Sequence, residues 1–287
     1  MNMLDNHVHT TFSRDGKDPM EKVIKRGLDI GVTHLTFTDH MEYNTDGFSI
    51  DFEKYCKSIE ELQWKYKNYI NIYTGIEVGY QKHLKDEINN IINKYAFDFV
   101  LCSTHTVDKI NVPDPMFFEG YSKEEVYRKY FTSILETVSE FKNFDTYGHL
   151  DYIVRYGNYE NNKVIYKDYK DVLDALLKTI IESGKGIELN TSGIRYNLEA
   201  MHPNKNILQR YKELGGEIIT VGSDSHQAKD ICKDFYKAYD MLEFLDYKYV
   251  CMFKERNPVY ISIEKSREGI VAWWTYGIIV RFTIFLQ

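Results

Sequence analysis

Short apolar runs rich in β-branched and aromatic residues recur along the chain, and longer amphipathic segments separate them. There are seven runs, which end at NHVHT, HLTFTDH, IYTGIEV, FDFVLCSTH, FDTYGHLD, GKGIELNTS and EIITVGSDSH. Strands that alternate with helices in this way pair in parallel. The pattern therefore predicts an α/β protein with a parallel sheet, either open or closed into a barrel.

Two amphipathic segments also carry helix boundary signals. Residues 19–31 begin with Pro19, which suits a first helical turn, and end with Gly31, which suits a C-terminal cap. Residues 169–184 end in the same way at Gly184. These signals predict helices between the strands.

Most side chains that could bind a metal or a substrate lie where an apolar run ends. In parallel α/β proteins the loops at the carboxyl ends of the strands form the site, so we expect these residues to meet there. Of the nine histidines, only His34, His83 and His202 lie elsewhere. The candidates at the run ends are His7, His9, Asp39, His40, Glu77, His105, His149, Asp151, Asn190, Asp224 and His226.

Composition narrows the class of protein. The chain has 287 residues, 43% of them hydrophobic, and a formal net charge of −7. This length suits one large domain as well as two small ones. The acidic balance argues against a surface that binds a nucleic-acid backbone, so we expect a small-molecule substrate.

The cysteines and the chain ends bear on location. Four cysteines without CxxC spacing are typical of reduced thiols, and no secretory signal precedes the first motif, so we expect a cytoplasmic protein.

Residues 1–263 form the predicted catalytic unit. Residues 264–287 are expected to be an apolar tail outside it, with a membrane anchor as the lesser alternative because the segment is marginal for a span. The oligomeric state is open.

The candidate ligands are too many for one ion. They include six imidazoles and three carboxylates, and such a mixed nitrogen and oxygen set suits zinc, manganese or iron better than calcium or magnesium. Several adjacent ions are therefore expected. These ligands are His7, His9, Asp15, His40, Glu77, His105, His149, Asp224 and His226.

The motifs HVHTTFSRDG, FTDH, GIEV, STH, GHLD and GSDSH, in this order, resemble those of the PHP (polymerase and histidinol phosphatase) metallophosphoesterase family. The resemblance covers about residues 4–263 and implies a distorted (β/α)7 barrel with a metal site at the C-terminal ends of its strands. Within the family, GIEVGY and GHLDYIVRY are most similar to the histidinol-phosphate phosphatases. One departure is Arg14 in SRDG, where the family often has serine, but Asp15 and Gly16 are kept.

The resemblance also implies a ligand set for two to three divalent ions. The first ion would take His7, His9, Glu77 and Asp224. The second would share Glu77 and add His105 and His149. The third would take Asp15, His40 and His226. Three divalent ions, three carboxylates and a bridging hydroxide leave a charge of about +2, which suits a phosphomonoester dianion.

The implied reaction is the hydrolysis of L-histidinol phosphate to L-histidinol and phosphate, as in histidine biosynthesis. The alternatives are another small phosphate monoester, a nucleotide or a phosphotyrosine as substrate, or a PHP domain that binds metal without catalysis. Arg155 suits bidentate phosphate contact, and His226, Asp224 or a metal-bound water could protonate the leaving group. Further candidates for the substrate pocket, each with a purely structural role as the alternative, are Asn190, Arg195 and His202.

Overall fold

The strands of the main sheet follow one another in sequence order. The computed structural model describes residues 3–44 and 47–264. Every pairing along the sheet is parallel, and neighbours run in the order β1, β2, β6, β7, β10, β11, β12. Their bounds are β1 (Met3–Val8), β2 (Val32–Phe37), β6 (Asn71–Gly79), β7 (Phe99–Ser103), β10 (Thr146–Tyr147), β11 (Gly186–Asn190) and β12 (Ile219–Gly222).

The two ends of this sheet approach each other. A parallel bridge joins Val8 to Ser225, and the His9 backbone N–H donates to the Ser225 carbonyl oxygen at 2.8 Å. The first strand therefore meets the segment after the last strand, and the sheet is a nearly closed barrel of seven strands. The predicted distorted (β/α)7 barrel is confirmed.

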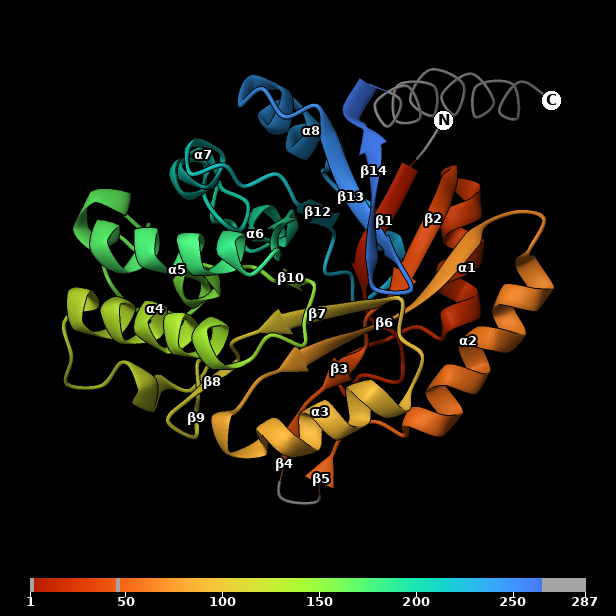
Figure 1. Ribbon diagram of the computed structural model, residues 1–287, viewed down its shortest axis with the longest axis horizontal. Helices are drawn as coiled ribbons and strands as arrows, with labels where there is room; N and C mark the ends of the chain where they lie inside the picture. Colours follow the sequence, from red (N-terminus) through yellow and green to blue (C-terminus); the bar gives the residue numbers. More distant parts are fainter. Residues whose placement is uncertain (1–2, 45–46, 265–287) are drawn as a thin grey trace.

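Helices lie around the outside of the strands (Figure 1). The predicted boundaries hold, since α1 follows Pro19 and both Gly31 (φ +83°) and Gly184 (φ +66°) end helices in the left-handed region. The helices are α1 (Met20–Asp29), α2 (Phe52–Tyr66), α3 (Lys85–Lys94), α4 (Lys123–Glu140), α5 (Lys170–Glu182), α6 (Ser192–Arg195), α7 (Lys205–Glu213) and α8 (Phe235–Phe244).

Further short strands lie outside the seven-strand path of the main sheet. β3 (His40–Met41) pairs with β6 in parallel, and two small antiparallel pairs lie in the connecting loops. These pairs are β4 (Tyr43–Asn44) with β5 (Gly47–Phe48) and β8 (Thr106–Val107) with β9 (Ile110–Asn111).

An antiparallel hairpin that the sequence pattern did not predict follows α8. It consists of β13 (Tyr249–Lys254) and β14 (Asn257–Ser262). The rings of Phe253 and Phe99 stack at 5.2 Å, and Arg256 donates to the carboxylate of Asp145 at 2.6 Å. Since Phe99 begins β7 and Asp145 immediately precedes β10, the turn of the hairpin lies at the amino-terminal ends of these strands.

The expectation of an apolar tail over residues 264–287 falls, apart from Glu264, outside the described residues. Within the described part of the chain, no helix combines the length and apolar character needed to span a membrane.

Candidate metal centre

The predicted histidine ligands converge at the carboxyl ends of the strands. His7 lies near the end of β1, His9 follows that strand, and the other four come from the ends of later strands or the loops that follow them. Facing Nε2 atoms lie 2.9 Å apart for His7 and His9. The same atoms lie 3.4 Å apart in two further pairs, His105 with His149 and His40 with His226. Six rings thus point nitrogen atoms into one volume.

Glu77 lies at the centre of this volume and is fully buried. Its Oε2 lies 2.8 Å from His40 Nδ1, and its Oε1 lies 2.9 Å from His149 Nε2. His7 and His9 Nε2 each lie 3.5 Å from Oε2. Burial by itself raises the pKa of Glu77, but the surrounding imidazoles outweigh burial and hold it well below its usual range, so the carboxylate is ionised.

Asp224 contributes another buried carboxylate to the cluster. Its Oδ1 lies 3.5 Å from His9 Nε2 and 3.7 Å from His7 Nε2, while its Oδ2 lies 3.1 Å from the guanidinium of Arg155. Its backbone adopts φ +52°, a strained left-handed conformation for a residue with a side chain. The turn after β12 therefore holds this carboxylate against the histidines.

Asp15 reaches the cluster from the solvent side, with its side chain 58% exposed. Its carboxylate lies 3.1 Å from His226 Nε2 and 3.6 Å from His40 Nε2. The adjacent Gly16 is needed for this geometry, because a Cβ there would lie 1.8 Å from the Thr10 carbonyl oxygen. The departure at Arg14 does not displace Asp15 from its two histidines.

The outward Nδ1 atoms of several rings are held by the protein. His7 Nδ1 pairs with the Glu188 carboxylate at 2.7 Å, and His105 Nδ1 pairs with Glu42 at 2.5 Å. His9 Nδ1 lies 3.1 Å from the Ser13 hydroxyl, which donates to Asp39 at 2.6 Å. Such contacts place the proton on Nδ1 and leave the Nε2 lone pair free to bind a cation.

These features fit divalent metal ions. Glu77 Oε2 is buried without a hydrogen-bond partner among the described residues, although imidazole nitrogens surround it. Groups of three ligand atoms lie close enough to hold an ion, and mixed imidazole and carboxylate sets suit zinc, manganese or iron. The groups are His7 with His9 and Asp224, His7 with Glu77 and His149, His9 with His40 and His226, and His40 with Glu42 and His105.

All nine predicted ligands therefore lie in one cluster. Their assignment to individual ions stays a prediction. Glu42 and Glu188 are functional candidates that the sequence reasoning missed. Glu188 carries a signal, since it is a charge inside the apolar run GKGIELN, two residues before Asn190 and on the same face of β11. Glu42 lies between two short strands, where no periodicity marks it.

Arg155 lies beside the cluster with its side chain 4% exposed. Its guanidinium carbon lies over the rings of Tyr152 and Tyr196, at 4.7 and 4.5 Å from their centroids. Burial lowers the pKa of Arg155, but Asp224 and the nearby tyrosines raise it above its usual value. A permanent cation is thus held at the edge of the metal cluster.

The other predicted pocket residues surround Arg155. Arg195 donates to the carbonyl oxygens of Ser223 and Asp224 at 2.6 and 2.9 Å, and its Nη1 is buried without a partner within the described residues. Asn190 donates to Glu188 at 3.0 Å, and its Oδ1 accepts the Ser192 backbone N–H at 2.9 Å. His202 contacts Asp151 and Arg155.

Two further histidines stand apart from the cluster, as expected. His34 lies within β2 with its Nδ1 2.9 Å from the Thr33 hydroxyl, and His83 is exposed. Asp39 and Asp151 face protein groups: Asp39 accepts from Thr10 and Ser13, and Asp151 pairs with the imidazole of His202.

Comparison with known proteins places the chain in a family. The model of the PHP domain matches residues 5–192. The chain belongs to the PHP domain family. It is 31% identical to histidinol-phosphatase of Lactococcus lactis over 273 residues, which is 94% of this chain and 99% of that protein. It is 33% identical to the probable histidinol-phosphatase of Clostridium acetobutylicum over 90% of this chain and 99% of that one.

A solved structure is also similar. The crystal structure of histidinol phosphate phosphatase from Lactococcus lactis superposes with a TM-score of 0.84 at 30% identity, covering 90% of this chain and 99% of that chain. That protein was crystallised in complex with zinc, L-histidinol and phosphate. The family resemblance drawn from the six sequence motifs is confirmed.

Proposed function

We propose that this protein is a metal-dependent phosphoric monoester hydrolase that converts L-histidinol phosphate to L-histidinol and phosphate. The observation that carries the proposal is the convergence of six imidazoles and three carboxylates next to a buried arginine. The histidinol-phosphatases of similar sequence, and the similar structure with zinc, L-histidinol and phosphate, support this substrate.

We infer that the site holds two to three divalent ions, with zinc, manganese and iron as the candidates. The three predicted ligand sets use ring nitrogens and carboxylates, which all three metals accept. When bound, the ions supply positive charge to a phosphate ester and lower the pKa of coordinated water. The side chains that would hold them are His7, His9, Asp15, His40, Glu77, His105, His149, Asp224 and His226.

The protein's own residues then bind and orient the ester. Arg155 points its Nη2 toward Asp224, so its planar fork suits a phosphate oxygen at the edge of the cluster. Arg195 and Asn190 are candidates for the same pocket. His226, with its side chain 26% exposed, and Asp224 are the candidates to pass a proton to the departing alkoxide.

We further propose a role in histidine biosynthesis in the cytoplasm, with a small-molecule substrate and no nucleic-acid partner. The four unpaired cysteines support a reducing compartment, and the net charge of −7 opposes the binding of long polyanions.

Phosphate release tests the proposal. Purified protein loaded with zinc or manganese is assayed with L-histidinol phosphate, nucleotides, sugar phosphates and phosphotyrosine. L-Histidinol phosphate should lead in kcat/KM by orders of magnitude. His9→Ala and Asp224→Ala should abolish turnover while the far-ultraviolet circular dichroism is kept. If another ester leads, the substrate assignment is wrong, and if no ester is hydrolysed, the domain binds metal without catalysis.

A further inference from the structure

His202 has a protein partner on each ring nitrogen. It is 1% exposed, its Nδ1 lies 2.6 Å from Asp151 Oδ1, and its Nε2 lies 3.0 Å from the Nε of Arg155. A guanidinium only donates hydrogen bonds, so Nε2 must accept. The imidazole is therefore neutral, with its proton on Nδ1 directed at the Asp151 carboxylate.

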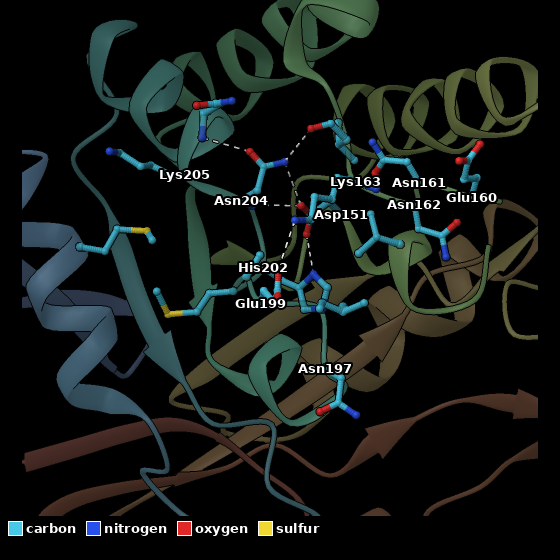
Figure 2. Close-up of a pocket in the computed structure, with 17 residues that line it drawn as sticks. Asp151, Glu160, Asn161, Asn162, Lys163, Asn197, Glu199, His202, Asn204 and Lys205 are labelled. Carbon is cyan, nitrogen blue, oxygen red and sulfur yellow. Dashed lines mark hydrogen bonds and ion pairs between the residues drawn. The ribbon is translucent and has the colours of Figure 1, made fainter. Parts of the chain in front are cut away.

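The backbone around this pair is also fixed. The N–H of His202 donates to the Asn190 carbonyl oxygen at 2.9 Å, and the reverse bond measures 2.7 Å. The second oxygen of Asp151 accepts the Asn204 backbone N–H at 3.0 Å (Figure 2). Asn204 in turn caps α7. The imidazole is thus anchored to β11 by its backbone and to α7 through Asp151.

The terminal nitrogens of Arg155 remain directed at the cluster of predicted metal ligands. Its Nε is taken by His202, while its Nη2 donates to Asp224 at 3.1 Å and to the Ser192 hydroxyl. The nearby rings of Tyr152 and Tyr196 limit the space around the guanidinium, but they offer it no hydrogen-bond acceptor that would set its rotation. The hydrogen bonds at Nη2 hold one end of the guanidinium, and the contact at Nε holds the other end, so rotation within the plane is set only when both contacts are present.

We propose that Asp151 and His202 form a positioning pair that sets the in-plane orientation of Arg155 toward the phosphate. The pair acts through Arg155 and does not touch the substrate, because both ring nitrogens are occupied within the protein. A neutral acceptor is required at this place, since a protonated ring would lose its lone pair and repel the guanidinium. The inference rests on the proposed role of Arg155 in phosphate binding.

A double-mutant cycle tests the coupling. His202→Ala, Arg155→Met and the double variant are compared with the unaltered protein in kcat/KM and in inhibition by inorganic phosphate. His202→Ala alone should lower kcat/KM about 10- to 100-fold, the usual cost of losing a group that orients a functional side chain. In the Arg155→Met background the same substitution should change kcat/KM by less than about threefold, because the residue through which it acts is gone.

Two more variants separate positioning from general damage to the fold. His202→Gln keeps a side-chain acceptor for Arg155 and should recover most of the phosphate affinity lost in His202→Ala. His83→Ala, which alters an exposed histidine away from the site, should behave like the unaltered protein. If His202→Ala does not fold, the cycle is run with His202→Leu or Asp151→Ala in its place.

The inference would be overturned if the fall in kcat/KM of the double variant equalled the product of the falls in the two single variants. It would also be overturned if His202→Ala left kcat/KM and phosphate inhibition unchanged. The cycle does not depend on the substrate assignment, since any ester that the protein hydrolyses serves. If no ester is hydrolysed, the proposed function is wrong, but the positioning pair can still be tested. The four metal-loaded proteins are then compared in their affinity for inorganic phosphate, measured by calorimetric titration. Equal phosphate affinity in all four proteins then counts against the pair.

Discussion

Glu188 links three parts of the cluster through a single buried carboxylate. One oxygen accepts from His7 Nδ1, and the other accepts the His149 backbone N–H at 2.9 Å and the Asn190 amide at 3.0 Å. Burial raises the pKa of Glu188, but the charges and hydrogen bonds of His7 and His149 together outweigh burial and lower the pKa, so the group is an anion. A carboxylate behind a ligating imidazole fixes the ring and increases its basicity.

Glu188→Gln should therefore weaken metal binding about 10- to 100-fold while the barrel stays folded. The amide keeps the shape of the side chain but removes the charge that raises the basicity of His7. Metal affinity is measured by titration of metal-free protein, with the exposed Glu53→Gln as the control. Equal affinity in Glu188→Gln and the control would show that Glu188 acts only as a packing group.

Gly16→Ala should damage the third predicted ion site selectively. An added Cβ would lie 1.8 Å from a backbone oxygen, so the Ser13–Gly16 turn must shift and carry Asp15 away from His40 and His226. We expect the metal content to fall by about one ion per chain, since one ligand set loses its carboxylate. Gly27→Ala in α1 is the matched control because its nearest contact would be 3.4 Å. Unchanged metal content would contradict the assignment of Asp15.

Among the structural elements, the strands and their ends were predictable, because apolar runs and polar run ends report burial directly. The hairpin of β13 and β14 was not. Its turn residues Glu255 and Arg256 adopt φ +50° and +66° without the Asn-Gly or Asp-Gly signal usual at such turns. Asp98 holds both residues, since its side chain accepts the Glu255 N–H at 3.0 Å and its carbonyl oxygen accepts the Arg256 N–H at 2.9 Å. This tertiary support has no local sequence pattern.

The candidate site likewise contains residues that the sequence pattern locates and residues that it does not. Predicted ligands such as His7 and His105 end apolar runs and could be located from the sequence. The partners of their outward nitrogens come from other elements: Glu188 is 181 positions from His7, and Glu42 is 63 positions from His105. The role of His202 likewise depends on Arg155, which is 47 positions away and folds against it. Only packing reveals such pairs.

At the scale of the elements, an ion pair between α5 and α7 allows a test of how helix contacts stabilise the fold. Asp174 on α5 accepts two hydrogen bonds from Arg210 on α7, at 2.9 and 2.8 Å. Asp174→Asn should lower the free energy of unfolding by about 1 kcal/mol at neutral pH. Arg210 lowers the pKa of Asp174 in the folded protein. The ion pair therefore makes its full contribution to the free energy of unfolding at pH values above the pKa that Asp174 has in the unfolded chain. This contribution is lost as the pH falls toward the lower pKa of the folded protein.

Urea unfolding of Asp174→Asn measured at several pH values checks this prediction. The stability difference from the unaltered protein should shrink as the solution is acidified. Asp171→Asn, which alters a more exposed acid on the same helix, is the control and should have a smaller effect at neutral pH. A difference that stays constant down to strongly acidic pH would contradict the ion-pair explanation.

At the scale of the whole molecule, the near-closed barrel brings residues that follow its first and last strands into one cluster. His9 lies beside Asp224 only because β1 meets the segment after β12. The cluster therefore forms only when the sheet closes, and ions that bind it bind the folded chain. Since binding to the folded state alone stabilises that state, the proposed binding of metal ions should be thermodynamically coupled to the folding of the barrel.

Removal of the metal should consequently lower the thermal stability of the entire barrel. At a free ion concentration of about 100 times Kd, one site contributes about 2.7 kcal/mol, which corresponds to about 5–10 °C in Tm for a domain of this size. Calorimetry of chelator-treated protein before and after addition of zinc or manganese measures the shift. In Glu77→Gln the rise should be smaller, because Glu77 lies at the centre of the ligand cluster. An equal Tm with and without metal would show that the cluster is not a metal site.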